Sequence, residues 1–272
     1  MTDDNIMTVA MPIESERLQE AIVTKKQGDY FATKGDFSSA LTYYKKSIRL
    51  DENYPDAHYA LAKLHNTDGE GYISAAFEFS LAWAHKDKFQ NELEKFEFYL
   101  DYARFLINKY KIEAPKQISK DIETCIEVSK EALKISQKSF EPYYYLAEAN
   151  YIIYRNSNHF YKNLRPETEE EAKERSKMRE ENNIRYEDIE KNLEIALKLR
   201  PQSYKVHSLA VIFYYESLGE FSSDNVSAVD KIRKDKLIEK IKYHGKNYRL
   251  YLPKNVTPDK NILTFIDTVN SR

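Results

Sequence analysis

The sequence predicts an all-α fold in which antiparallel helical hairpins stack as a solenoid, and three observations support this prediction. The 272-residue chain has only 6 glycines and 8 prolines, so turn-forming residues are scarce. Small residues recur at a helical-repeat distance, from Gly28 to Ala62 and from Ser47 to Ala82. The chain also has 22 tyrosines and 13 phenylalanines, bulky side chains that can fill the space beside small ones where helices cross.

The first helix of each predicted hairpin carries a small residue with an apolar residue three or four positions later. The small residues are Gly28, Ala62, Ala103, Ala147 and Ala210, and their companions are Phe31, His65, Leu106, Tyr151 and Phe213, of which His65 departs from the pattern. The second helices share three positions: Ala40, Tyr44 and Ser47; Ala75, Phe79 and Ala82; Cys125, Ser129 and Ala132; Ile189, Leu193 and Ala196. Because residues three and four apart share one helix face, each triplet predicts a buried seam.

This repeating unit resembles the tetratricopeptide repeat (TPR), a helical hairpin of about 34 residues. The best match runs from Gly28 to Leu50, and it has Gly28, Phe31, Gly35, Phe37, Ala40 and Tyr44 at signature positions. The segment from Ala196 to Pro201 matches the usual end of a repeat. The resemblance covers about residues 16–253. It implies a right-handed solenoid of about five TPR-like repeats, some of them degenerate or interrupted by insertions.

The two ends of the chain differ from the repeats. Residues 1–14 are expected to be a flexible N-terminus, and Ser15 is expected to begin a first helix that runs to Lys34 within a solenoid of residues 15–254. Residues 255–272 are expected to form a capping helix and a tail. The sequence Thr257-Pro258-Asp259 is a strong helix start, and an apolar stripe follows it: Ile262, Leu263, Phe265 and Ile266. Such a helix would cover the outer face of the last repeat.

A charged insertion at residues 156–188 is the most individual feature of the sequence. It lengthens the fourth hairpin by thirty residues relative to the first, and residues 167–183 include seven acidic and four basic side chains without an apolar stripe. Pro166 and the glutamates after it suit a helix start, so one long helix from Pro166 to Leu199 is expected, its first half projecting into solvent. A partly disordered charged loop is the alternative. A second long loop is expected around residues 220–229.

Motifs for catalysis or cofactor binding are missing from the sequence, which has neither a phosphate-binding glycine loop nor a Gly-x-Ser-x-Gly elbow. The six histidines are not clustered, and Cys125, the single cysteine, occupies a helix-contact position. We therefore expect no enzyme activity, no cofactor and no metal. The net charge of −2 gives no case for a nucleic acid partner. Residues 1–14 resemble neither a signal peptide nor a transmembrane segment, so a cytoplasmic location is expected.

The TPR resemblance implies a concave groove, lined by the first helices, that takes a partner peptide or helix. The groove positions carried over by register are Lys25, Asp29, Tyr59, Lys63, Arg104, Tyr144, Glu148, Tyr151, His207 and Tyr214. The tyrosines among them are expected to be exposed anchors. The TPR subtype that clamps chaperone C-terminal carboxylates is excluded, because Asp29 and Ala60 stand where that clamp needs asparagines.

Two functions are therefore left open. The first is a non-catalytic scaffold or adaptor that binds another protein in the groove. The alternative is a regulatory or assembly subunit of a membrane-associated or enzymatic machine, contacted through the basic stretch Asp230–Lys254. That stretch has nine basic and three acidic residues, with Tyr243, Tyr248 and Tyr251 between them. A solvated helix face is the simpler interpretation of the same charges.

Overall fold

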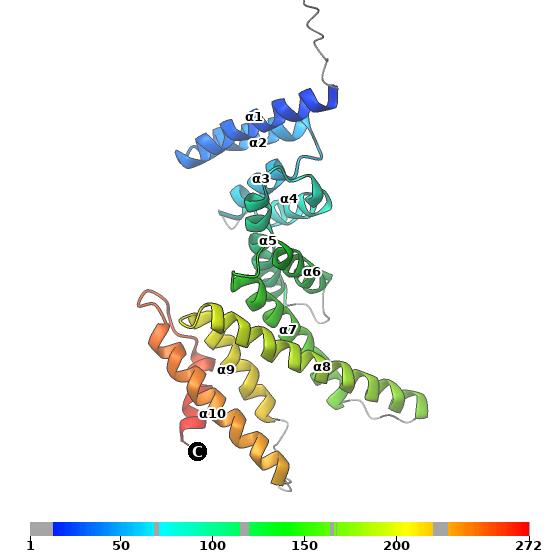
Figure 1. Cartoon of the computed structure of the whole chain (residues 1–272), viewed down its shortest axis with the longest axis vertical. Helices are drawn as coiled ribbons and strands as arrows, with labels where there is room; N and C mark the ends of the chain where they lie inside the picture. The colour runs from blue at the N-terminus through cyan, green and yellow to red at the C-terminus, as the bar shows by residue number, and fades with distance from the viewer. Residues whose placement is uncertain are drawn as a thin grey trace, which may run out of the picture. The chain divides into compact units, whose positions relative to one another are not determined.

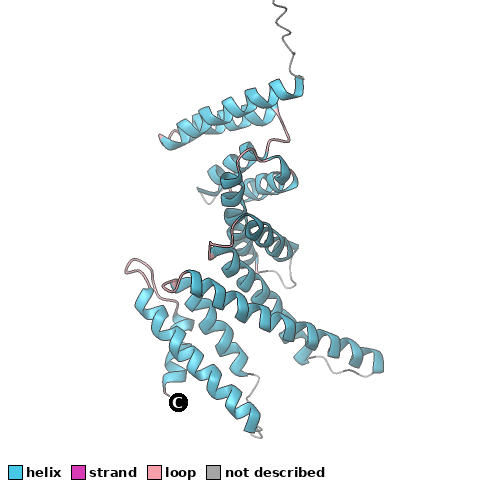
Figure 2. Cartoon of the chain, in the orientation of Figure 1, coloured by secondary structure: helices cyan, strands magenta, loops and turns pink. Residues whose placement is uncertain are grey.

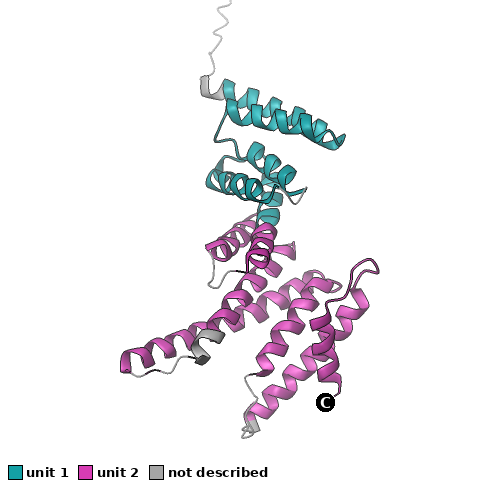
Figure 3. Ribbon diagram, turned by 180° about the vertical axis from the view of Figure 1, so that it is seen from behind, with its two compact units in different colours: residues 1–102 teal, residues 103–272 magenta. Residues whose placement is uncertain are grey.

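A computed structural model describes residues 13–67, 71–114, 120–163, 166, 168–219 and 228–271. Within these residues the protein consists of helices and connecting loops without strands, so the all-α prediction is confirmed (Figures 1 and 2). Most of the N-terminus and of the loop expected near residue 220, namely residues 1–12 and 220–227, lies outside the described part. The chain divides into two compact units within helix α5, residues 1–102 and 103–272 (Figure 3).

Unit 1 contains two helical hairpins and the beginning of α5. Its elements are α1 (Ile13–Thr33), α2 (Phe37–Leu50), α3 (Pro55–Thr67), α4 (Tyr72–Ala84), the 3₁₀ turn η1 (Lys86–Lys88) and the first half of α5 (Glu92–Glu113). Helix α1 packs along α2, and α3 packs along α4. The start of α5 joins the second hairpin through Phe98, whose ring centroid lies 5.4 Å from that of Tyr59 and 6.4 Å from that of Phe79. An aromatic cluster therefore forms the core between α3, α4 and α5.

Unit 2 contains the longer hairpins. After the end of α5 come α6 (Lys120–Ile135), α7 (Glu141–Asn163), α8 (Glu169–Leu199), α9 (Tyr204–Leu218), α10 (Ala228–Tyr251) and α11 (Lys260–Asn270). Helix α7 pairs with α6 on one side and with α8 on the other, and α9 pairs with α10. One apolar core runs from α7 through α11, with Leu193, Phe213 and Ile241 among its buried members.

The small residues of the repeat lie at the helix contacts, as the register predicted. All four triplets of the second helices are buried, and the same holds for Ala62, Ala103, Ala147 and Ala210 of the first helices. In the first hairpin, a Cβ atom added to Gly28 would come within 2.5 Å of the Tyr44 ring, so this contact requires glycine. The Ser47 hydroxyl donates to the carbonyl oxygen of Ala21 at 2.7 Å. Helices α1 and α2 are therefore held together by close packing at Gly28 and by a hydrogen bond from Ser47.

The charged insertion contributes to a single helix, α8, that begins at Glu169. Thr168 is its N-cap and forms a capping box with Glu171, so Pro166 precedes the helix and is not part of its first turn as expected. The first half of α8 lies largely in solvent, because its first buried side chain is Asn182. An ion pair between Lys173 and Glu169 at 3.2 Å supports this exposed half.

The ends of the described chain differ slightly from the expectation. Helix α1 begins at Ile13, two residues before the expected start at Ser15. Helix α11 begins at Lys260 with Asp259 as its N-cap, so the expected hydroxyl cap at Thr257 is wrong. The Asp259 carboxylate accepts hydrogen bonds from the backbone N–H groups of residues 261 and 262. The carboxylate therefore satisfies N–H groups that Thr257, outside the helix, does not reach.

Helix α11 packs on α9 and α10 through one apolar face. Ile262, Ile266 and Val269 are buried, and the Phe265 ring stacks on Tyr215 with centroids 4.0 Å apart. A Cβ atom on Gly245 of α10 would come within 2.7 Å of Ile266, so the two helices approach closely at this glycine. The last hairpin is thus covered by a short amphipathic helix.

Candidate functional site

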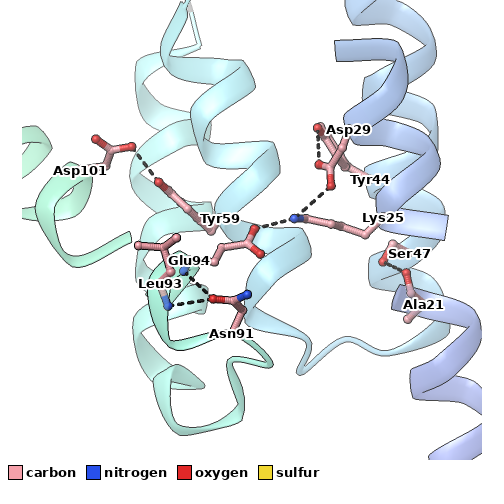
Figure 4. A network of polar contacts seen from close by, with 10 residues as sticks. All are labelled: Ala21, Lys25, Asp29, Tyr44, Ser47, Tyr59, Asn91, Leu93, Glu94 and Asp101. Atoms are coloured by element: carbon pink, nitrogen blue, oxygen red, sulfur yellow. Dashed lines mark hydrogen bonds and ion pairs between the residues drawn. The ribbon is translucent and has the colours of Figure 1, made fainter. Parts of the chain in front are cut away.

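A polar network joins the first helices of unit 1, and Figure 4 shows its side chains converging from α1, α3 and α5. We call this surface of α1, α3 and the start of α5 the first-helix face. The Lys25 Nζ atom lies 2.5 Å from Glu94 Oε1 and 3.1 Å from Asp29 Oδ2. The Tyr44 hydroxyl donates to the other oxygen of Asp29 at 3.0 Å. Lys25 therefore links two helices through carboxylates of the chain itself.

Lys25 is a buried cation that its neighbours neutralise. Burial disfavours the ammonium group, but Asp29 and Glu94 outweigh this effect and raise the pKa of Lys25 above its usual value. A partner carboxylate would have to displace one of these two internal partners. This geometry agrees with the exclusion of a carboxylate clamp, because Glu94 already occupies the Lys25 ammonium group. The repeat register did not identify Glu94.

Tyr59 of α3 is buried beneath the first-helix face. Its ring is only 1% exposed, and its hydroxyl donates to Asp101 Oδ2 at 2.8 Å. The Lys63 ammonium lies 4.1 Å from the centroid of that ring, a cation–π arrangement. The expectation that Tyr59 is an exposed anchor is wrong, because Phe79 and Phe98 enclose its ring. Lys63 remains exposed above it.

Asp56 adds a buried carboxyl group beside this network. Its side chain is 1% exposed, and its Oδ2 atom has no hydrogen-bond partner within the described chain. Burial, and then the nearby Glu94, raise the pKa of Asp56 to about 7, with Lys25 acting in the opposite direction. The group is therefore held close to its titration point at neutral pH.

In unit 2, the candidate residues of α7 belong mainly to the packing of the unit. Tyr151 is buried against Phe213, and its hydroxyl donates to Glu216 Oε2 at 2.7 Å. Glu148 is also buried, with one carboxylate oxygen 2.5 Å from Lys111 Nζ. Tyr144 is half-buried, and burial together with Glu148 raises the pKa of its hydroxyl. Tyr151 is thus not the exposed anchor that was expected.

The candidate residues of α9 are buried as well. His207 lies between Pro201 and His244, with both ring nitrogens at 2.9 Å from an acceptor or donor. Since His207 Nε2 donates to the Pro201 carbonyl oxygen, its neutral Nδ1 accepts from His244. Burial, reinforced by His207, lowers the pKa of His244 to about 3. Tyr214 is buried and stacks on His244, so the expectation that Tyr214 is an exposed anchor is wrong, and His207, which the register placed in the groove, is buried as well.

The register found part of the first-helix face, on which Lys63 is exposed and Asp29 is partly exposed. Of the candidates in unit 2, Arg104 is exposed and Tyr144 is partly exposed. Glu94 and Asp101 complete the network and were missed, because the expected register began at Ala103 and α5 extends eleven residues further back. Their spacing of seven residues, two helical turns on one face, is the signal that could have identified them.

Chemically, the described residues offer ion pairing and hydrogen bonding. They contain no group of three metal-ligating side chains, and no helix among them is long and apolar enough to span a membrane. Cys125 is buried with its sulfur 3.6 Å from the Ala103 carbonyl oxygen, and burial raises the pKa of the thiol.

Comparison with known proteins agrees with this architecture. The model of the TPR repeat family matches residues 28–69. Curated protein sequences include none that matches the chain. Among solved structures, the fold is similar to YrrB, described as a TPR protein with an unusual peptide-binding site. Sequence identity to YrrB is 11%, the TM-score is 0.53, and the match covers 88% of this chain and 95% of YrrB. A MamA RS-1 double mutant has 12% identity, a TM-score of 0.50 and coverage of 85% and 96%.

The matched repeat contains the glycine contact of Gly28 and the seam of Ala40, Tyr44 and Ser47, and later hairpins repeat the same buried small residues. Identity this low establishes fold only, and the family model itself covers a single repeat. On these grounds residues 28–69 match a tetratricopeptide repeat, and the helical hairpins of the chain share the fold of TPR proteins.

Proposed function

We propose that the protein is a non-catalytic scaffold that binds a segment of another protein along the first-helix face of unit 1. TPR folds offer extended surfaces built from successive helices, which suits protein interaction in general. The observation that carries the proposal is that α5 is linked to α1 by the Lys25–Glu94 ion pair and to α3 by the hydrogen bond from Tyr59 to Asp101. The peptide-binding site described for YrrB belongs to that protein, and its likeness to this chain is one of fold.

The charges of this face favour a partner segment that carries basic side chains. Asp29, Glu94, Glu97 and Asp101 provide four carboxylates, and Lys25 is already paired with two of them. Glu97 is exposed and lies near enough to Tyr59 to contribute, after burial and Asp101, to its raised pKa. An incoming lysine or arginine would meet these carboxylates, whereas an incoming carboxylate would meet like charge.

A double variant tests the proposal without touching the buried network. Lys63→Ala with Glu97→Ala removes one exposed cation and one exposed anion and leaves the net charge unchanged. The control variant is Glu123→Ala with Lys130→Ala, which removes one exposed anion and one exposed cation from α6 in unit 2, outside the first-helix face. Both variants and the parent protein would be used to capture partners from the source cell after crosslinking. Loss of a specific partner in the first variant alone supports the proposal, and retention by both variants contradicts it.

The alternative, a regulatory or assembly subunit contacted through the basic end, is supported by α10. This helix presents exposed cations such as Lys231, Arg233 and Lys246. A partner held by exposed α10 charges should dissociate steeply as salt rises, because such contacts are screened over about 10 Å at 0.1 M salt. A captured partner that the Lys63→Ala, Glu97→Ala variant retains, and that salt releases, would favour this alternative.

A further inference from the structure

A groove lies within unit 2 between second helices, away from the first-helix face. It has a volume of about 490 Å³ and is lined mainly by α8 and α10, with α7 and α9 at its base. Asn183, Tyr186 and Glu187 on its α8 wall belong to the inserted part of the fourth hairpin. Figure 1 shows α8 and α10 diverging toward their N-terminal ends. We refer to this feature as the α8–α10 groove.

An ion pair joins the two walls at one place. Lys240 Nζ lies 2.5 Å from Glu190 Oε1, and the same ammonium lies 4.8 Å from the centroid of the Tyr214 ring. Both partners of this pair are only partly exposed. Lys240 and Glu190 thus neutralise each other and hold α8 and α10 together at this point of the groove.

Toward the N-terminal end of α10 the groove carries cations without internal partners. Arg233 and Lys236 line it and are exposed, and neither has an ion-pair partner among the described residues. They lie one and two turns before Lys240, so all three share one face of the helix. Arg233 and Lys236 can therefore bind anionic groups, whereas Lys240 is already neutralised by Glu190.

The base of the groove is aromatic and rigid. Tyr154 and Tyr186 line it with ring centroids 6.0 Å apart in an edge-to-face arrangement. Phe213 lies under both, at 5.9 Å from Tyr154 and 4.7 Å from Tyr186. Because core packing already fixes these rings, their side chains lose little conformational entropy when a ligand binds against them.

The geometry points to a second binding site: the α8–α10 groove takes an acidic segment of a partner protein, with carboxylates on Arg233 and Lys236 and an apolar side chain against the tyrosines. This site goes beyond the first-helix face of the proposed function and does not depend on it. A polyphosphate backbone fits less well, because it has no apolar side chain to place against Tyr154 and Tyr186 at the base of the groove. The volume suits a few side chains.

The test uses the full chain and a fluorescent acidic peptide with one aromatic residue, Glu-Asp-Phe-Glu-Asp. Arg233→Glu with Lys236→Glu should weaken its binding about tenfold or more, because attraction becomes repulsion at the two free cations. Lys231→Glu with Lys246→Glu is the matched control, since it makes the same charge change at exposed α10 positions that do not line the groove. The control should bind within about twofold of the parent, as expected for charges screened by solvent.

Several outcomes would overturn the site. Equal losses in both double variants would show that the charge of α10 acts without the groove, and tighter binding of a single-stranded oligonucleotide of equal charge would assign the cations to nucleic acid. Peptide addition to the unmodified protein should slow hydrogen exchange in residues 183–190 and 233–240, and no slowing there would contradict the site even if a variant misfolds. The Lys63→Ala, Glu97→Ala variant should bind the peptide normally, so the two proposals fail separately.

Discussion

At the level of single residues, tyrosines stabilise the hairpins by burying their rings and directing their hydroxyls to carboxylates. Tyr44 donates to Asp29, Tyr59 to Asp101 and Tyr151 to Glu216. In all three cases the acceptor lies on another helix, so each hydrogen bond joins two helices. A tyrosine can combine apolar burial with such a polar end, which explains why this chain uses so many of them.

Tyr151 allows the ring and the hydroxyl to be tested separately. Tyr151→Ala should lower the free energy of unfolding by about 3 kcal/mol or more, because it empties a buried site against Phe213. Tyr151→Phe keeps the ring and should cost about 1 kcal/mol, the net value of one hydrogen bond to Glu216. Urea unfolding followed by circular dichroism would measure both. Equal losses in the two variants would mean that the hydrogen bond, and not the ring, carries the stability.

Asp56 makes stability depend on pH. Its pKa is raised to about 7 in the folded protein, against about 3.9 for an unperturbed aspartate, so its favourable contribution is complete below about pH 4 and is lost as pH rises through 7. Asp56→Asn removes this titration. The variant should therefore gain about 2–3 kcal/mol relative to the parent between pH 5 and pH 8.

Denaturant midpoints at pH 5, 6.5 and 8 would measure the gain of Asp56→Asn. Asp29→Asn offers a comparison on the same face, because Asp29 is partly exposed and paired with Lys25. A difference between Asp56→Asn and the parent that stays constant over this range would show that Asp56 is already ionised in the folded protein at pH 5.

At the level of elements, α8 has two halves with different support. The half from Ile189 to Leu199 packs into the core, with Ile189, Leu193 and Ala196 buried, whereas Glu169 to Glu181 lacks buried side chains. Isolated helices are only marginally stable in water, so the exposed half depends on its capping box, on its ion pairs and on continuation from the packed half.

The two halves of α8 should therefore differ in their rates of amide hydrogen exchange. Amides in residues 172–181 are expected to exchange much faster than those in residues 189–199, because local opening of the exposed half breaks no apolar contacts. Thr168→Ala should accelerate exchange further in the first turns, at a cost of about 1 kcal/mol, and leave residues 189–199 unchanged. Mass spectrometry of peptic fragments would show this. Uniform protection along α8 would mean that another element packs against its first half.

For the whole molecule, a repeat architecture predicts that damage stays near its origin, because each hairpin contacts mainly its neighbours. Gly28→Val forces a side chain against the buried Tyr44 ring in unit 1, and Ala196→Leu overfills the α7–α8 seam in unit 2. Each should cost about 1–3 kcal/mol.

The readout for these two variants is hydrogen exchange along the full chain. Gly28→Val should accelerate exchange chiefly in α1 to α4, and Ala196→Leu chiefly in α7 to α10. Ala172→Leu, at an exposed position of α8, should change neither region. If either core variant accelerated exchange equally in both units, the chain would unfold as one cooperative body and the nearest-neighbour description would fail.

The sequence identified the fold and the helix contacts because both follow from short-range rules. Helical periodicity places residues three and four apart on one face, and only small residues permit close crossing. Gly28, the triplet of Ala40, Tyr44 and Ser47, and Ala196 were therefore found from spacing alone, and their burial agrees. The amphipathic helix at the C-terminus was visible for the same reason, although its cap is Asp259.

The tertiary structure decided which of those faces remain accessible. Periodicity assigns a side chain to a helix face but does not reveal what later segments place against it, so Tyr59, Tyr151 and Tyr214 were expected in solvent and are buried. The pairing of Lys25 with Glu94 joins residues 69 positions apart, and the groove between α8 and α10 depends on how an inserted helix diverges from its neighbour. Burial and charge pairing are properties of the assembled chain, because each depends on long-range contacts that local spacing does not contain.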